Sequence, residues 1–205
     1  MNKKNINRKN IEVVLKEINE IALEISEKQS ECLVNQILKA KRVFLVAIGR
    51  VNLSLQCFGK RLSHLGIKVE LVGSLTEKPA TNKDLLIVAS GSGESLVPLE
   101  IAKKAKKIGC KILLITSAKT SSIRSLSNFV VEIKTPTKPK TLIKKNIKQK
   151  ENLFDSSSKL KKSIQPMSTV FDQVLHIYGD CIALRLIEKL KLNKKDLWKS
   201  HANLE

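Results

Sequence analysis

The stretch DLLIVASGSGESLVPLEIAKKAKK, residues 84–107, decides the fold. Its apolar run from Leu85 to Ala89 has the length and composition of a strand that is buried on both faces. The run ends abruptly in small residues, SGSGES at 90–95, and apolar residues then recur with a helical period. The segment therefore predicts a strand at 84–90, a tight turn, and a helix at 95–108.

The same alternation of apolar runs and helical patterns continues on both sides of this segment. Apolar runs that alternate with helices are typical of a parallel sheet covered on both faces. We therefore expect an α/β fold, a three-layer αβα sandwich with a five-stranded parallel, flavodoxin-like sheet. The other expected strands are 42–49, 68–73, 111–117 and 129–134, and the other expected helices are 11–25, 30–41 with Ser30 as N-cap, 51–66, 121–128, a long helix from near Ser168 to 190, and 194–200.

The chain of 205 residues is expected to form one domain with an interruption. Residues 1–41 would supply N-terminal helices, 42–134 the core sheet, and 164–205 the C-terminal helix and tail. Residues 135–163 are rich in Lys, Ser and Pro and lack sustained periodicity. This composition predicts a mobile insert within the single domain.

The formal net charge of +19 is concentrated in segments outside the expected core. Residues 134–162 contain ten lysines and two acids, and residues 1–10 carry four basic residues and no acid. Aromatic residues make up only 3% of the chain, so stacking platforms for single-stranded nucleic acid are scarce. We expect no specific nucleic-acid partner, and a solvated lysine-rich loop is favoured over contact with a polyanion.

The apolar runs and the cysteines bear on location. No run of 18 apolar residues occurs, and the basic start of the chain has no apolar signal region, so neither a membrane span nor export is expected. The four cysteines are scattered without metal-ligand spacing, and three lie in apolar segments. We expect no metal site, and buried, reduced thiols in a cytoplasmic protein. The cysteines are Cys32, Cys57, Cys110 and Cys181.

The turn after the central strand has the composition of an anion-binding site. Gly91 and Gly93 allow a close approach of the backbone, and Ser90, Ser92 and Ser95 supply hydroxyl donors beside a helix N-terminus. The pattern is neither a Walker A loop nor GxGxxG, so the phosphate need not come from a nucleotide and no cofactor is implied. An equally good interpretation from the turn alone is that Ser92 or Ser95 caps the helix.

SGSGES at 90–95, placed between a strand and a helix, resembles the sugar-phosphate-binding loop of SIS (sugar isomerase) domains. The chain more specifically resembles 6-phospho-3-hexuloisomerases, because further segments match motifs of that family in the same order. The resemblance runs from about residue 10 to the end, interrupted by the lysine-rich insert. The matching segments are AIGRV at 47–51, KRLSHLG at 60–66, VGSL at 72–75, IQPMSTVFDQ at 164–173 and HANLE at 201–205.

The resemblance implies an aldose–ketose-type isomerase that uses neither metal nor nucleotide. Its reaction would interconvert D-arabino-3-hexulose 6-phosphate and fructose 6-phosphate, the second step of formaldehyde fixation in the ribulose monophosphate route. Moving the carbonyl from C3 to C2 requires a base that removes the C2 proton and a donor that stabilises the enediolate. The resemblance also implies a homo-oligomer, a dimer or a tetramer, with the site near the subunit interface.

The resemblance assigns roles to individual residues, each with a simpler alternative. Asp172 stands where the family has glutamate and is the first choice as base, although an acid there also suits the helix dipole. His201 in the terminal motif could act as acid/base or polarise the carbonyl, and His64 matches a family histidine. Either could instead be a surface or helix-end residue. Arg50, after Gly49 at the expected ligand edge, could bind phosphate or a hydroxyl, or form a surface salt bridge.

Several residues depart from the family pattern near the expected site. Val51 replaces a serine, Ser74 a loop glutamate, Ser168 a glycine and Asp172 a glutamate. These departures keep two alternatives open. One is a protein that binds a sugar phosphate without turnover, and the other is an isomerase for a different phosphosugar such as arabinose 5-phosphate.

Overall fold

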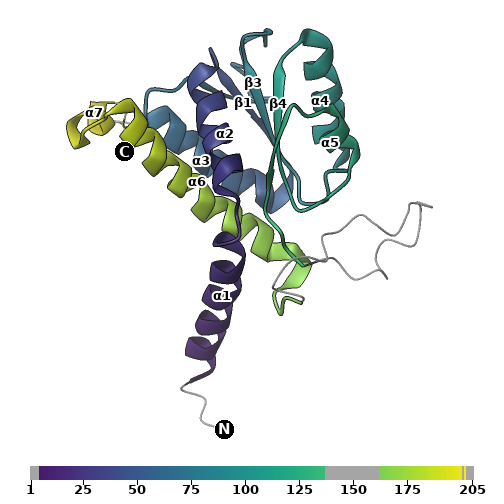
Figure 1. Ribbon diagram of the computed structural model, residues 1–205, viewed down its shortest axis with the longest axis vertical. Helices are drawn as coiled ribbons and strands as arrows, with labels where there is room; N and C mark the ends of the chain where they lie inside the picture. Colours follow the sequence, from purple (N-terminus) through teal and green to yellow (C-terminus); the bar gives the residue numbers. More distant parts are fainter. Residues whose placement is uncertain (1–4, 137–161, 200, 202–205) are drawn as a thin grey trace.

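Five parallel strands form the central sheet of the computed structural model, which describes residues 5–136, 162–199 and 201 (Figure 1). The order across the sheet is β2-β1-β3-β4-β5, the order of flavodoxin-like folds. The strands are β1 (Val43–Val46), β2 (Val69–Leu71), β3 (Leu85–Ala89), β4 (Lys111–Thr116) and β5 (Phe129–Glu132).

Helices cover both faces of this sheet, which confirms the expected three-layer sandwich (Figure 1). One face carries α2 (Glu27–Lys39), α3 (Gly49–His64) and α6 (Thr169–Leu190), and α1 (Ile6–Ala22) contacts α6. The other face carries α4 (Leu96–Ile108) and α5 (Ser122–Leu126), while η3 (Pro166–Ser168) leads into α6 and α7 (Lys194–Lys199) follows it. Each face has its own buried apolar cluster.

The central strands are apolar without interruption because both of their faces are covered. All residues of β1 and β3 are buried, as are all residues of β4 after its first. The edge strand β2 is only partly buried. Continuous burial explains why these strands lack the alternating pattern of a sheet with one wet face.

Helices α3 and α6 run side by side in the same direction along one face of the sheet (Figure 1). Arg50 meets Asp172 near their first turns, and Arg61 Nε lies 2.8 Å from Asp180 Oδ1 further along. Gly179 makes the close approach possible, because a Cβ there would lie 3.0 Å from Phe58 Cβ. The pair therefore runs from the carboxyl ends of the strands toward their amino ends.

Helix α2 begins earlier than the sequence predicted. Its N-cap is Ser26, whose side chain accepts from the Gln29 N–H at 3.4 Å. The choice of Ser30 was wrong: Ser30 is buried inside the helix, and its Oγ accepts from the Tyr178 hydroxyl at 2.9 Å. Burial raises the pKa of Tyr178 to about 12, although the hydrogen bond with Ser30 acts in the opposite direction.

The cysteines are all unpaired, but their burial differs from expectation. Only Cys110 is buried, where burial raises the pKa of its thiol. Cys57 on α3 and Cys181 on α6 are exposed, and Cys32 is half-buried. The expectation of buried thiols for three of the four cysteines is therefore wrong for at least two of them. In the described part of the chain, no helix combines the length and apolar character needed to cross a membrane.

Candidate active site

The turn that follows β3 folds back around Ser90. The Gly93 N–H donates to Ser90 Oγ at 3.0 Å, and the same oxygen lies 3.0 Å from Ser95 Oγ. Gly93 has a φ of +64°, and a Cβ at this position would collide with the Ser121 side chain. The turn therefore requires glycine at position 93.

Helix α4 begins directly after this turn and has no side-chain cap. Its N-cap residue Ser95 makes no capping hydrogen bond, and Ser92 Oγ accepts instead from the Glu94 N–H at 3.2 Å. Ser95 thus occupies the N-cap position, as one alternative expected, but neither Ser95 nor Ser92 caps the helix with its side chain. The uncapped N–H groups of the first turn, with the positive end of the helix dipole, can attract an anion.

A cavity of about 360 Å³ lies at the carboxyl ends of β1, β3, β4 and β5. It includes the point between β1 and β3 where the strand order reverses, the usual ligand position in open α/β sheets. Gly93 shapes the turn without lining the cavity. The other residues expected to bind the substrate phosphate and Asp172 all line it: Gly49, Arg50, Ser90, Gly91, Ser92 and Ser95 from the first group, and Asp172 from α6.

The acid within the turn does not oppose anion binding. Glu94 Oε1 accepts from the Ser122 N–H at 2.7 Å, at the start of α5. This hydrogen bond holds the Glu94 carboxylate at α5, and Glu94 does not line the cavity. The positive charge of Arg50 at the cavity is therefore not matched by an acid of the turn.

Arg50 and Asp172 form an ion pair across the first turns of α3 and α6. Arg50 Nη2 donates to Asp172 Oδ2 at 3.0 Å, and its Nε approaches Oδ1 at 3.5 Å. The Asp172 side chain is 9% exposed, whereas that of Arg50 is 64% exposed. The pair fixes the carboxylate at the cavity wall and leaves much of the guanidinium open to a ligand. A substrate oxygen that engaged Arg50 would lie beside the carboxylate.

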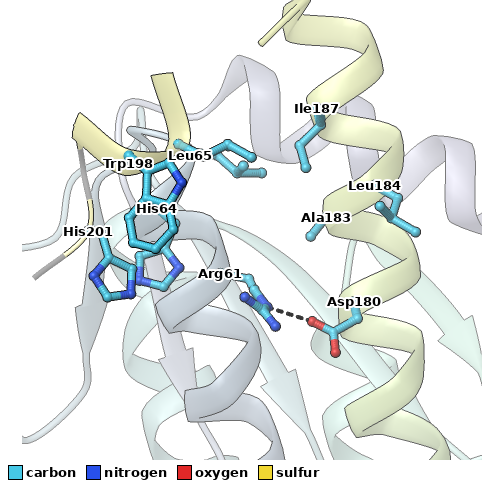
Figure 2. Close-up of a pocket in the computed structure, with 10 residues that line it drawn as sticks. Arg61, His64, Leu65, Asp180, Ala183, Leu184, Ile187, Trp198 and His201 are labelled. Atoms are coloured by element: carbon cyan, nitrogen blue, oxygen red, sulfur yellow. Dashed lines mark hydrogen bonds and ion pairs between the residues drawn. The ribbon is translucent and has the colours of Figure 1, made fainter. Parts of the chain in front are cut away.

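His64 and His201 lie together at the opposite end of the α3–α6 pair. Their rings stack with centroids 5.1 Å apart, and Trp198 lies against His201 at the same centroid distance. Figure 2 shows these rings grouped beside the ion pair of Arg61 and Asp180. They line a second cavity of about 480 Å³.

The two cavities are far apart within one chain. Fifteen residue steps of α3 separate Gly49 from His64, which is about 22 Å at 1.5 Å per residue. The structure thus brings Arg50, Asp172 and the 90–95 turn together, and it brings His64 and His201 together, but it does not join the two groups within one chain.

Further polar and apolar residues line the first cavity and were missed from the sequence. Ser117 and Thr135 follow β4 and β5, and their hydroxyl oxygens lie 2.7 Å apart. The rule that identified the 90–95 turn, that ligands bind at the carboxyl ends of strands, could have identified both. Thr135 also lies in the segment that the sequence assigned to the insert, whose residues 137–161 fall outside the described residues. The other lining residues outside the expected binding set are Ile48, Val51, Ala89, Pro136, Met167, Thr169 and Phe171.

The described residues contain no group of three His, Cys, Asp or Glu side chains that could hold a metal ion. The residues that line the first cavity offer a carboxylate, a guanidinium, hydroxyls and backbone N–H groups. These groups can bind a phosphate ester and move a proton.

Comparison with known proteins places this arrangement in a family. Residues 38–117, which include β1 and the 90–95 turn, match the SIS domain. The chain is 32% identical to the 3-hexulose-6-phosphate isomerase of Bacillus subtilis (strain 168) over 192 residues, 94% of this chain and 95% of that protein. The chain belongs to the 3-hexulose-6-phosphate isomerase family. The family resemblance inferred from the short motifs is thus confirmed.

A second relative and a solved structure support the same family assignment. The 3-hexulose-6-phosphate isomerase of Mycobacterium gastri is 31% identical over 96% of this chain and 90% of that protein. A crystal structure of a hypothetical protein from Methanococcus jannaschii, for which a molecular function of 3-hexulose-6-phosphate isomerase was inferred, superposes with a TM-score of 0.75. It is 27% identical and covers 96% of this chain and 99% of that one.

Proposed function

We propose that the protein interconverts D-arabino-3-hexulose 6-phosphate and fructose 6-phosphate. The observation that carries this proposal is the cavity where an uncapped helix N-terminus faces a buried carboxylate paired with an arginine. Membership of the 3-hexulose-6-phosphate isomerase family supplies the substrate class. The reaction would be the second step of formaldehyde fixation, carried out in the cytoplasm.

The phosphate ester would occupy the turn at 90–95. The N–H groups at the start of α4 and the hydroxyls of Ser90, Ser92 and Ser95 would donate to its oxygens. This contact holds the end of the substrate that does not react. Its binding energy positions C2 and C3 in the remaining part of the cavity.

Asp172 would take the C2 proton, and the electron pair of the broken C–H bond would form the C2–C3 double bond of an enediolate. Arg50 would stabilise the negative charge that develops on the C3 oxygen. Return of a proton to C3, with transfer of the hydroxyl proton from O2 to O3, gives fructose 6-phosphate with no net oxidation. Arg50 must share its donors between Asp172 and the substrate, which its exposed guanidinium allows.

A second copy of the chain would complete the site. The outward sides of α3 and α6 expose apolar and sulfur-containing side chains between the two cavities. Two copies that packed these sides antiparallel about a twofold axis would place the His64 end of one against the Arg50 end of the other. The two histidines would then supply an acid and a carbonyl polariser to the neighbouring cavity. The exposed residues are Leu53 and Cys57 on α3, and Ile177, Cys181 and Leu184 on α6.

A direct turnover assay tests the proposed function. Purified protein given 3-hexulose 6-phosphate in deuterated water should form fructose 6-phosphate that carries solvent deuterium at carbon. Binding of the sugar phosphate with neither product nor exchange would instead favour a binding protein. Faster exchange with arabinose 5-phosphate than with the hexulose phosphate would favour another phosphosugar isomerase.

A further inference from the structure

Glu17, on α1, is a buried acid outside the cavity that the proposed chemistry does not use. The residue is 4% exposed although it carries a carboxylate. A buried carboxylate is costly unless hydrogen bonds replace its water. Its partners therefore indicate what the residue is for.

Among the described residues, Glu17 accepts hydrogen bonds from one short segment far away in the sequence. Oε2 accepts from Ser163 Oγ at 2.7 Å and from Gln165 Nε2 at 2.9 Å, and Oε1 accepts from the Ile164 N–H at 2.9 Å. Ser163 Oγ in turn accepts from the Gln165 N–H at 3.0 Å. Burial acts to raise the pKa of Glu17, but these hydrogen bonds outweigh it and lower the pKa, so the acceptor is the ionised form.

The segment held by Glu17 leads directly into the wall of the first cavity. The next residues form the short helix η3, in which Met167 has a φ of +52°. Thr169 Oγ1 donates to Pro166 O at 2.5 Å, which closes the connection to α6. Met167 and Thr169 line the cavity, and Asp172 follows in the first turn of α6. The path from Glu17 to the proposed base is therefore short and continuous.

We propose that Glu17 is a positioning residue for the isomerase site, an inference that rests on the proposed function. Its carboxylate fixes residues 163–165, and through them the Met167–Thr169 wall and the start of α6 that carries Asp172. The phosphate is held by a different part of the fold, the 90–95 turn. Loss of Glu17 should therefore disturb the reacting end of the substrate more than its phosphate end.

Kinetics of Glu17→Gln test this division. The amide can no longer accept from all three donors, so kcat should fall about 10- to 100-fold, the size expected when a reacting group is misplaced by a fraction of an ångström to one ångström. KM should stay within about threefold, because the 90–95 turn is untouched. Glu12→Gln on the same helix removes an exposed acid, paired with Arg8, and should leave both constants unchanged. An unchanged kcat in Glu17→Gln would overturn the proposal.

A readout that does not need turnover separates this proposal from the proposed function. The sequence has two methionines, at position 1 and at position 167, so the Met167 methyl group can be assigned by NMR. Fructose 6-phosphate should shift this resonance in the wild type and in Glu12→Gln, and should shift it much less in Glu17→Gln. An equal shift in Glu17→Gln would overturn the role of Glu17, whatever the assay shows. Absence of turnover in the wild type would instead overturn the proposed function.

A milder variant covers the case in which Glu17→Gln does not fold. Ser163→Ala removes one donor and keeps the buried charge, so it should lower kcat in the same direction by about two- to fivefold, the effect of one modest hydrogen bond. Wild-type kcat and a wild-type Met167 shift in Ser163→Ala, with Glu17→Gln unfolded, would overturn the proposal.

Discussion

The two ends of the α3–α6 pair are built in opposite ways. At one end, Arg50 and Asp172 meet beside a turn whose serines and glycines are consecutive in the sequence, and the cavity is closed by four strand ends. At the other end, the ring of His64, from α3, stacks on the ring of His201, which follows α7. The exposed ion pair of Arg61 and Asp180 lies beside them. The first end has the groups that the proposed phosphate contact needs, whereas the second has a cavity lined by aromatic and apolar side chains and the Arg61–Asp180 pair. This difference is the reason for the proposal that the reaction centre is divided between two copies of the chain.

The largest effect should come from the carboxylate of the first end. Asp172→Asn keeps the shape of the side chain and removes the base, so kcat should fall by about 10²- to 10⁴-fold. Binding of fructose 6-phosphate, measured by calorimetry, should change only a few-fold. Glu188→Gln is the matched control, because it removes an exposed acid from the same helix at a position that lines neither cavity. A wild-type kcat in Asp172→Asn would show that the base lies elsewhere.

The division between copies predicts complementation. His64→Ala alone should lower kcat by about 10²-fold, as expected for loss of one acid–base group. Mixing it with Asp172→Asn after unfolding and refolding should restore about one quarter of the wild-type activity, because half of the dimers contain one intact site. Activity that stays at the sum of the two variants would show that the histidines do not serve a neighbouring cavity.

A substitution in the backbone of the 90–95 turn should have a smaller effect than loss of the Asp172 carboxylate, but a larger effect than most substitutions at the protein surface. Gly93→Ala introduces a Cβ at a φ of +64° that collides with Ser121, so the affinity for fructose 6-phosphate should fall about tenfold and stability by about 1–3 kcal/mol. Gly73→Ala is the control, since it has a similar positive φ of +86° but its Cβ would meet no atom within 4 Å and it does not line the first cavity. Equal losses in the two variants, measured by calorimetry and thermal melting, would contradict a special role for the turn geometry.

The sequence predicted the local features of the first end but not its long-range contacts, for a physical reason. Apolar runs and glycine-rich turns are local signals, so the strands and the 90–95 turn followed from them. The pairing of Arg50 with Asp172 joins residues 122 positions apart, and only the packing of α3 on α6 reveals it. Likewise, hydroxyls such as Ser117 and Thr135 gain their meaning from the neighbouring strand ends, and the buried role of Glu17 depends on a segment that carries no periodic pattern.

The smallest expected effect is the pH dependence of the stability that Glu17 contributes beside the first end. The pKa of Glu17 is lowered in the folded protein, so its contribution to stability is fully present above its ordinary value of 4.5 and is lost as pH falls through the lowered value. Glu17→Gln should therefore be about 1–3 kcal/mol less stable than the wild type at pH 7, and the gap should shrink between pH 5 and lower pH. Urea unfolding at several pH values measures this gap.

Asp180→Asn, at the second end, removes a carboxylate whose side chain is 48% exposed and should show a small gap at all pH values. A gap for Glu17→Gln that is independent of pH would mean that the lost stability comes from packing rather than from the ionised carboxylate that holds the cavity wall.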